Sequence, residues 1–407
     1  MNLAKTSQYL LIIYFAFLIA IKPVSLIAFW ILTIFGLYWI IKDKINPFKI
    51  KYAKYAAILP LFYFFTMFIS NILSTMPESK FSNLGRVLYL LFSPLIVVVI
   101  YKINFPFKKF INTMKISSII IGSIVLTQLI LNGFIIHRYG GMYNVNTYGD
   151  IAVFFTLFSI ININNENKKD FIFSVISFLF GLSAIILSGS RGSLLSFLIL
   201  LLIFTILNFI YFKESRSKII YLFSITLILV SSIFFTTNYF KNRVHTATHQ
   251  IQNWEKGKDK TSSVATRLVM WTKGIEAFKD KPIIGYGYHN AIPAISKYIE
   301  DKKVKERYKA HWHLHNEIIN TMVNSGIIGL IALLALYIVP IKIFLNNLKK
   351  HTSPSIAGII LMSGFIVMGI THTLFGYEYE TSLFVIMLSY LFLKLNHPKY
   401  KKILKPT

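Results

Sequence analysis

Apolar residues along the chain are gathered into long runs that are separated by short polar and basic segments. Twelve of these runs are long enough to cross a hydrocarbon layer of about 30 Å. They cover residues 7–21, 24–41, 55–74, 87–101, 116–136, 148–165, 171–188, 192–212, 219–240, 317–341, 352–376 and 381–395. The pattern therefore predicts an all-α polytopic membrane protein with about 12 transmembrane helices.

The first two runs are almost continuous, since residues 9–41 are interrupted only by Lys22 and Pro23. One helix of that length would measure about 50 Å, which is too long to cross a bilayer without severe tilt. We therefore expect two shorter helices that meet at Lys22–Pro23. No small-residue cleavage site follows the first run and another span begins at once, so we expect this segment to be retained rather than removed as a signal peptide.

The overall composition agrees with a membrane setting. Hydrophobic residues make up 55% of the 407 residues and charged residues only 14%, and the mean hydropathy is +0.59. Cysteine is absent. The sequence thus excludes a disulfide framework, a thiolate metal site and a cysteine nucleophile.

The formal charge of +27 suggests a nucleic-acid partner until the basic residues are placed on the predicted topology. An even number of spans puts both termini on one side. If that side is the cytoplasm, the inner segments hold 23 of the 43 Lys and Arg residues, the short outer loops hold five, and the long outer segment 237–316 holds fifteen. Inner loops of membrane proteins are rich in Lys and Arg. The charge therefore indicates topology and contact with membrane lipids, and we expect no nucleic-acid partner.

The predicted topology divides the chain into three parts. Residues 1–236 carry nine transmembrane helices, and residues 237–316 form a large outer loop with an amphipathic helix that opens at Arg267. Residues 317–407 carry the last three helices and a basic cytoplasmic tail. We found no repeat of fixed period.

The unusual polar residues gather on the outer side of this topology. Arg138 follows the fifth span, and Arg191 is the only charge in the short turn Ser188-Gly-Ser-Arg-Gly-Ser193. Arg267 opens the amphipathic helix, and the segment His311-Trp-His-Leu-His-Asn-Glu317 directly precedes the tenth span. Guanidinium groups and histidines on one face suit an anionic substrate and a proton-transfer step.

Each of these residues also has a purely structural interpretation. An arginine at a membrane boundary often anchors its helix by snorkelling, which is the interpretation we favour for Arg86 at the fourth span. Arg191 has little apolar surface to cover in its Ser/Gly turn and suits bidentate phosphate binding, whereas Arg267 could belong to the polar face of a surface helix. Three alternate histidines could hold zinc in an extended segment. With no cysteine and no nearby carboxylate beyond Glu317, a proton-accepting histidine is favoured.

Together these segments resemble the O-antigen ligase family of membrane glycosyltransferases, which also contains O-antigen polymerases and O-linked oligosaccharyltransferases. The resemblance covers about residues 135–340. It rests on the Arg138 segment, on Ser-Arg-Gly around Arg191, on Thr266-Arg-Leu-Val-Met-Trp271 with the downstream Pro-Ile-Ile-Gly-Tyr-Gly, and on His313-Leu-His-Asn-Glu317. The last motif is most similar to that of ligases that join O-antigen to lipid A-core.

The resemblance implies a GT-C-like helical fold in the bacterial inner membrane, with cytoplasmic termini and a periplasmic active site. The donor would be an O-antigen linked to undecaprenyl diphosphate, the acceptor would be lipid A-core, and neither a cofactor nor a metal ion would be needed. By likeness to the family, Arg191 and Arg267 would bind the diphosphate, with Arg138 as a third cationic group, and His315 would be the catalytic residue.

Four further positions are secondary candidates, namely Arg86, His313, Asn316 and His372. His313 and Asn316 flank His315 in the family-like motif. His372 stands where some ligases have an aspartate late in the eleventh span, and we interpret it as a packed or pore-facing residue. This chain therefore has no acidic residue at that position that could take the role of the aspartate.

The residue types suit the implied chemistry. A diphosphate leaving group gains negative charge as its bond to the sugar breaks, and fixed guanidinium groups stabilise that charge. A neutral histidine can accept the proton of the attacking hydroxyl. A transporter or flippase for lipid-linked sugars is the alternative from another class. It should show polar or broken helices near the midplane, whereas the predicted spans are nearly free of charge.

Overall fold

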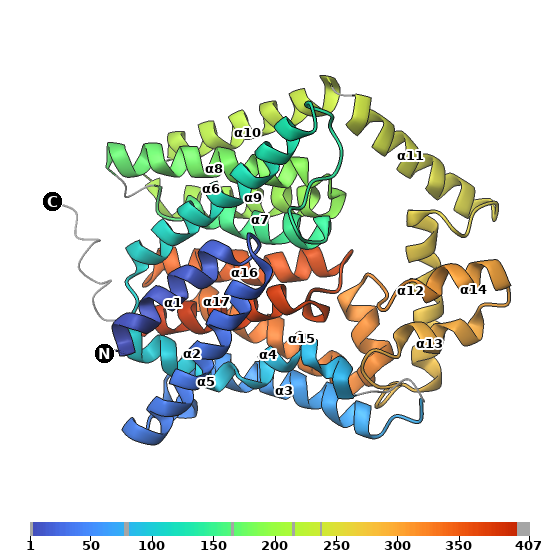
Figure 1. The fold of residues 1–407 in the computed structure, drawn as a ribbon, viewed down its shortest axis with the longest axis horizontal. Coiled ribbons are helices and arrows are strands. Elements are labelled where there is room, and N and C mark those ends of the chain that lie inside the picture. Colours follow the sequence, from blue (N-terminus) through green and yellow to red (C-terminus); the bar gives the residue numbers. More distant parts are fainter. Residues whose placement is uncertain (1–2, 77–80, 164–166, 214–215, 237, 397–407) are drawn as a thin grey trace.

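The computed structural model describes residues 3–76, 81–163, 167–213, 216–236 and 238–396, and every regular element within these ranges is helical (Figure 1). The basic tail that the sequence places after residue 396 lies outside the described residues. The first part of the chain contains α1 (Leu3–Phe17), α2 (Lys22–Asp43), η1 (Pro47–Lys49), α3 (Ala53–Ile72), η2 (Phe81–Arg86), α4 (Leu88–Leu91), α5 (Ser93–Ile103), α6 (Phe107–Leu131), α7 (Val145–Ser159), α8 (Lys168–Leu187), α9 (Arg191–Tyr211) and α10 (Arg216–Thr236).

The remaining helices form the segment 238–309, which the sequence predicts to be outside the membrane and which we call the outer segment, and the C-terminal part. The outer segment contains α11 (Asn238–Glu255), α12 (Ser263–Asp280), α13 (Ala291–Ile295), η5 (Ser296–Tyr298) and α14 (Lys302–Lys309). The C-terminal part contains α15 (Glu317–Asn347), α16 (Thr352–Gly369), η6 (Leu374–Gly376) and α17 (Glu378–Leu395). The helix that we expected to open at Arg267 is α12, which begins four residues earlier.

The predicted all-α polytopic membrane class is confirmed. Within the described ranges, seven helices are long and apolar enough to cross a membrane, and α1 and α5 are shorter apolar helices. The seven are α2, α3, α6, α8, α9, α15 and α16. The predicted number of twelve crossings stays a prediction.

The break between the first two spans is confirmed as well. α1 ends at Phe17 and α2 begins at Lys22, with Pro23 in its first turn. Proline is tolerated there because the first N–H groups of a helix have no partner within the helix.

Two helices run through the middle of the molecule. In Figure 1, α16 and α17 lie between α6–α10 on one side and α2–α5 with α15 on the other. α17 packs against α3, α5, α7 and α16, and all its side chains from 380 to 395 are buried. The turn between α16 and α17 is buried too, at Leu374, Phe375 and Gly376.

The outer segment gathers at one end of the bundle, where α12 packs against α15 (Figure 1). The Gly285-Tyr-Gly287 turn lies against the one break in α15, at Gly326, whose φ is +62°. The backbone N–H of Tyr286 donates to the carbonyl of Val323 over 2.9 Å, and that of Ile327 donates to Pro282 over 2.7 Å. A Cβ at position 285 would meet the α15 backbone at 2.6 Å. The glycines thus allow the outer segment to dock directly onto α15.

Candidate active site

The three arginines singled out in the sequence converge on one polar cavity. Arg138 comes from the loop before α7, Arg191 is the first residue of α9, and Arg267 lies on α12. The rest of the lining is polar apart from one glycine and consists of Asn146, Asp150, Ser190, Gly192, Ser263, Thr371 and His372. We call this space the arginine cavity. Its lining unites segments from residue 138 to residue 372, so the cavity exists only in the folded bundle.

Arg191 is placed by a tight connection between α8 and α9. Gly189 has a φ of +60°, and the Ser190 side chain caps α9 by accepting the N–H of Ser193 over 3.3 Å. A Cβ at Gly192 would lie 2.8 Å from the hydroxyl of Thr371. The N-terminus of α9 can therefore approach the turn after α16 closely, and helix N-termini themselves favour bound anions.

The other two arginines are held in different ways. The Nη2 of Arg138 donates to the side-chain oxygen of Asn146 over 2.6 Å, and its Nε donates to the carbonyl of Ser188 over 3.4 Å. Burial and then the positive charge of Arg191 lower the pKa of Arg267, while Asp150 opposes this effect. An arginine stays protonated in proteins despite such shifts. The cavity therefore brings cationic groups close together, an arrangement that an anionic ligand would stabilise.

A buried histidine–carboxylate pair forms one wall of the arginine cavity. The Nδ1 of His372 lies 2.9 Å from Oδ2 of Asp150, and the other oxygen of Asp150 accepts the Ser193 hydroxyl over 2.6 Å. His372 and Asp150 are only 4% and 3% exposed, and the second ring nitrogen of His372 has no hydrogen-bond partner. Our sequence-based interpretation of His372 as packed or pore-facing did not anticipate its place beside the arginines.

The pKa of His372 differs from that of an ordinary histidine. Burial alone would lower the pKa of His372, but the hydrogen bond that the ring donates to Asp150 and the charges of Asp150 and Glu380 outweigh burial, so the pKa of His372 is raised. Sequence reasoning missed Asp150 and Glu380. The signal was present for Asp150, because a lone carboxylate in the predicted span 148–165 marks a functional candidate.

One group among the described residues has the spacing to hold a metal ion, namely Asp150, His372 and Glu380, whose ligand atoms all lie within 4.8 Å of one another. The hydrogen bond between His372 and Asp150 already occupies both groups. A cation there would also add positive charge beside the arginine cavity. We therefore interpret the group as a buried ion pair with a neighbouring carboxyl.

The histidine segment before α15 lies next to the arginine cavity. The ring of His313 is buried, its Nε2 lies 3.2 Å from the Tyr377 hydroxyl, and its Nδ1 accepts the backbone N–H of His315 over 3.0 Å. The Nε2 of His315 lies 3.3 Å from Nδ1 of His311, while its own Nδ1 has no partner. The rings of His313 and His372 are 6.0 Å apart. The two predicted histidines thus face different partners.

The backbone and the charge of His315 are both unusual. Its φ is +51°, a left-handed conformation that is uncommon for residues other than glycine and that often occurs at functional sites. Burial, followed by the charge of Arg267, lowers the pKa of His315 to about 2. Burial also lowers the pKa of His313 well below its usual range. Both rings are therefore neutral at physiological pH.

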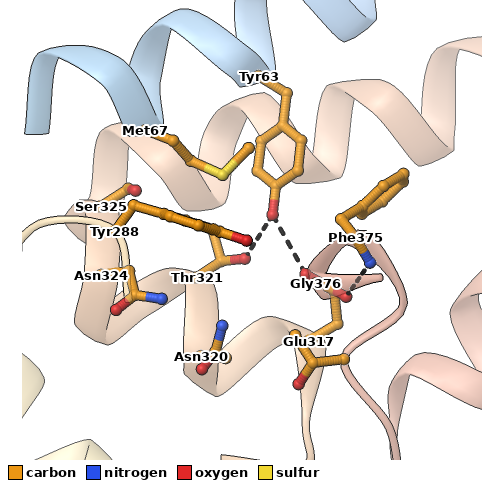
Figure 2. Close-up of a pocket in the computed structure, with 11 residues that line it drawn as sticks. Tyr63, Met67, Tyr288, Glu317, Asn320, Thr321, Asn324, Ser325, Phe375 and Gly376 are labelled. Carbon is orange, nitrogen blue, oxygen red and sulfur yellow. Dashed lines mark hydrogen bonds between the residues drawn. The ribbon is translucent and has the colours of Figure 1, made fainter. Parts of the chain in front are cut away.

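Asn316 and Glu317 fix the histidine segment to the turn that carries His372. Asn316 caps α15 by accepting the N–H of Ile319 over 3.0 Å, and its amide donates to the carbonyl of Ile370 over 3.1 Å. Figure 2 shows Glu317 between Tyr63, whose hydroxyl lies 3.3 Å away, and the backbone N–H of Phe375, 3.1 Å away. These bonds explain how the segment 311–315 and His372 come together.

Arg86 lies outside the lining of the arginine cavity. Its guanidinium stacks over the ring of Trp312, 4.2 Å from the ring centre. Such a cation–π contact stabilises structure by about 0.5–2 kcal/mol. The contact supports a structural role for Arg86, although the predicted membrane anchoring itself stays a prediction.

Comparison with known proteins identifies the central part of the chain. The sequence profile of the O-antigen ligase family matches residues 176–334. This segment of the chain is therefore similar to the O-antigen ligase family. The chain is 27% identical over 334 residues to an uncharacterized protein of Haemophilus influenzae, covering 79% of this chain and 78% of the relative. It is also 34% identical over 101 residues to the exopolysaccharide production protein ExoQ of Rhizobium meliloti, covering 24% of this chain and 22% of ExoQ.

The matched region contains only part of this site. Arg191, Arg267 and His315 lie within it, whereas Asp150 and His372 lie outside. Members of the O-antigen ligase family are membrane glycosyltransferase-like enzymes that act in polysaccharide biosynthesis. The structure brings the family segment together with residues from α7 and from the turn after α16.

Proposed function

We propose that this protein is an O-antigen ligase, which transfers a glycan from undecaprenyl diphosphate to a sugar hydroxyl of lipid A-core. The observation that carries the proposal is the convergence of Arg138, Arg191 and Arg267 on one cavity beside a neutral histidine segment. A lipid-linked donor and a lipid-anchored acceptor both suit a site built at the end of a membrane bundle.

The arginine cavity would bind the diphosphate of the donor. Planar guanidinium groups bind phosphate oxygens bidentately, and the N-terminus of α9 adds a partial positive charge. As the bond between the sugar C1 and the phosphate oxygen breaks, its electron pair leaves with the diphosphate. The arginines stabilise the charge that then develops, and no nucleotide is needed because the energy lies in the broken bond.

His315 would accept the proton of the acceptor hydroxyl as that oxygen forms its bond to C1. Its ring is neutral and has an unpartnered Nδ1. Part of the reason for its low pKa is the charge of Arg267, which a bound diphosphate would compensate. Donor binding would thus raise the basicity of His315 when the base is required. A single displacement at C1 inverts the configuration.

An O-antigen polymerase or O-linked oligosaccharyltransferase of the same family is the second candidate, because ExoQ is an exopolysaccharide production protein. Lipopolysaccharide from a strain that lacks this gene separates the two main candidates on a gel. We expect every O-antigen band to disappear while polymer accumulates on the lipid carrier. Core that carries a single repeat would instead identify a polymerase.

A transporter is less well supported, although α15 contains the kind of break that transporters show. The break at Gly326 lies against the segment 282–287, which forms backbone hydrogen bonds with the residues of α15 around the break. The freed backbone groups of α15 are therefore used to dock the outer segment and do not line a path for a substrate.

The basic residues support one orientation in the bacterial inner membrane. Both termini and the loop 42–54 would be cytoplasmic, and residues 237–316 with the active site would be periplasmic, because 23 basic residues fall on the inner side. We expect a reporter that is active only in the periplasm to work when fused at Lys258 and to fail at Lys402. Activity at Lys402 would overturn this topology.

A further inference from the structure

His372 is the group at the arginine cavity to which the proposed function gives no role. It lies in the turn after α16, outside the family match, and is 4% exposed. Its Nδ1 is bonded to Asp150, which Ser193 holds in turn. With Nδ1 occupied, Nε2 is the ring atom without a hydrogen-bond partner, and His372 lines the cavity.

The groups around His372 come from several elements and carry opposite charges. Asp150 on α7 and Glu380 on α17 are buried carboxyl groups that favour the protonated ring. Arg267 on α12 opposes protonation, and Arg138 and Arg191 share the cavity lining. The uncharged rings of Tyr377 and His313 lie 4.9 and 6.0 Å from that of His372. Asp150 accepts a hydrogen bond from the ring, a carboxyl oxygen of Glu380 lies within 4.8 Å of a ring nitrogen, and the three arginines share the cavity.

The pKa values of His315 and His372 are shifted in opposite directions. The pKa of His315 is lowered by burial and Arg267, whereas the pKa of His372 is raised because Asp150 outweighs burial. In active sites, two titratable groups whose environments separate their pKa values often take the roles of base and acid. His315 is already assigned as the base, so His372 is free to serve as a donor.

We propose that His372, held by its hydrogen bond to Asp150, donates a hydrogen bond from Nε2 to the diphosphate of the donor and acts as a further donor group of the arginine cavity. Asp150 is the positioning residue that fixes the ring and its proton. The proposal rests on the proposed function, because it requires a diphosphate in the cavity. It extends that function because diphosphate binding would then depend on the protonation of His372, which lies outside the matched residues 176–334.

The test measures binding of inorganic pyrophosphate to the full-length protein in lipid nanodiscs between about pH 6 and about pH 9. Wild-type protein is compared with His372→Gln, which keeps a neutral side chain that can hydrogen-bond. The protonation of pyrophosphate itself changes with pH, but it affects both proteins equally and cancels in the ratio of their affinities. Asp150→Asn keeps the shape of the pair and removes the charge that holds His372 protonated.

We expect wild-type protein to bind about tenfold or more tightly than His372→Gln at low pH, the scale of one hydrogen bond between charged groups. This advantage should vanish as pH rises through the pKa of His372. In Asp150→Asn it should vanish at a lower pH. An affinity ratio that does not change with pH, or an unshifted midpoint in Asp150→Asn, would overturn the role of His372.

A matched control separates this inference from the proposed function. Arg191→Ala should lose most pyrophosphate binding at every pH if the cavity is the diphosphate site. Binding that depends on Arg191 but not on the protonation of His372 would contradict the role of His372 and leave the proposed function unchanged. Failure of wild-type protein to bind pyrophosphate at any pH would overturn both. If His372→Gln does not accumulate in the membrane, the shift between wild type and Asp150→Asn still decides the question.

Discussion

Replacing Arg191 or Arg267 with alanine is expected to abolish glycan transfer while the protein still accumulates in the membrane. Both side chains line the arginine cavity, where the proposed function places the leaving diphosphate, and loss of a single fixed donor to a developing charge costs about 10²–10³-fold in rate. Lysine at either position should restore transfer only in part, because an ammonium group cannot reproduce the bidentate guanidinium geometry.

Arg86→Ala is the matched control for these two variants. It also removes a guanidinium, but this one stacks on Trp312 and is absent from the cavity lining. Its effect on transfer should be far milder. The measurement is the yield of glycan-bearing lipopolysaccharide, normalised to the amount of protein in the membrane. Normal transfer by either cavity variant would remove that arginine from the site.

His315→Ala is expected to lower transfer by about 10²-fold or more, the usual contribution of a general base, with unchanged membrane levels and intact donor binding. The pKa of His315 lies well below its ordinary value, so the ring stays neutral as pH falls. His315 should therefore cause no loss of kcat/KM between about pH 8 and about pH 6.

His313→Ala is the informative comparison for the base. His313 is held by Tyr377 and accepts the backbone N–H of His315, so its loss should disturb the position of His315 and reduce transfer less completely. A fully active His315→Ala together with an inactive His313→Ala would move the base to His313.

The sequence predicts that the arginines gather on one side of the helices, because hydropathy and the distribution of Lys and Arg indicate which loops share a side. The break at Lys22–Pro23 was equally accessible, since a proline restricts the backbone locally. These features depend on residues close together in the chain. The convergence of Arg138, Arg191 and Arg267 could be expected on one side, but the cavity that they share required the structure.

The pairing of His372 with Asp150 could not be predicted in the same way. The two residues are 222 positions apart, and no local sequence pattern links them. Their contact depends on how α7 and α9 pack against the turn after α16, including the space left by Gly192. The break of α15 at Gly326 is similar, because it is stabilised by backbone bonds to a distant segment. Hydropathy carries no information on such contacts.

The central claim is that the arginine cavity catalyses transfer of a glycan from a lipid diphosphate to a lipid-anchored sugar. Purified protein in lipid vesicles would be given a labelled undecaprenyl diphosphate glycan and lipid A-core in excess chelator. We predict one undecaprenyl diphosphate released for each glycan joined to the core, and no product with Arg191→Ala or Arg267→Ala. Movement of intact donor across the membrane without a new bond, or transfer that persists in the Arg191→Ala, Arg267→Ala double variant, would contradict the account.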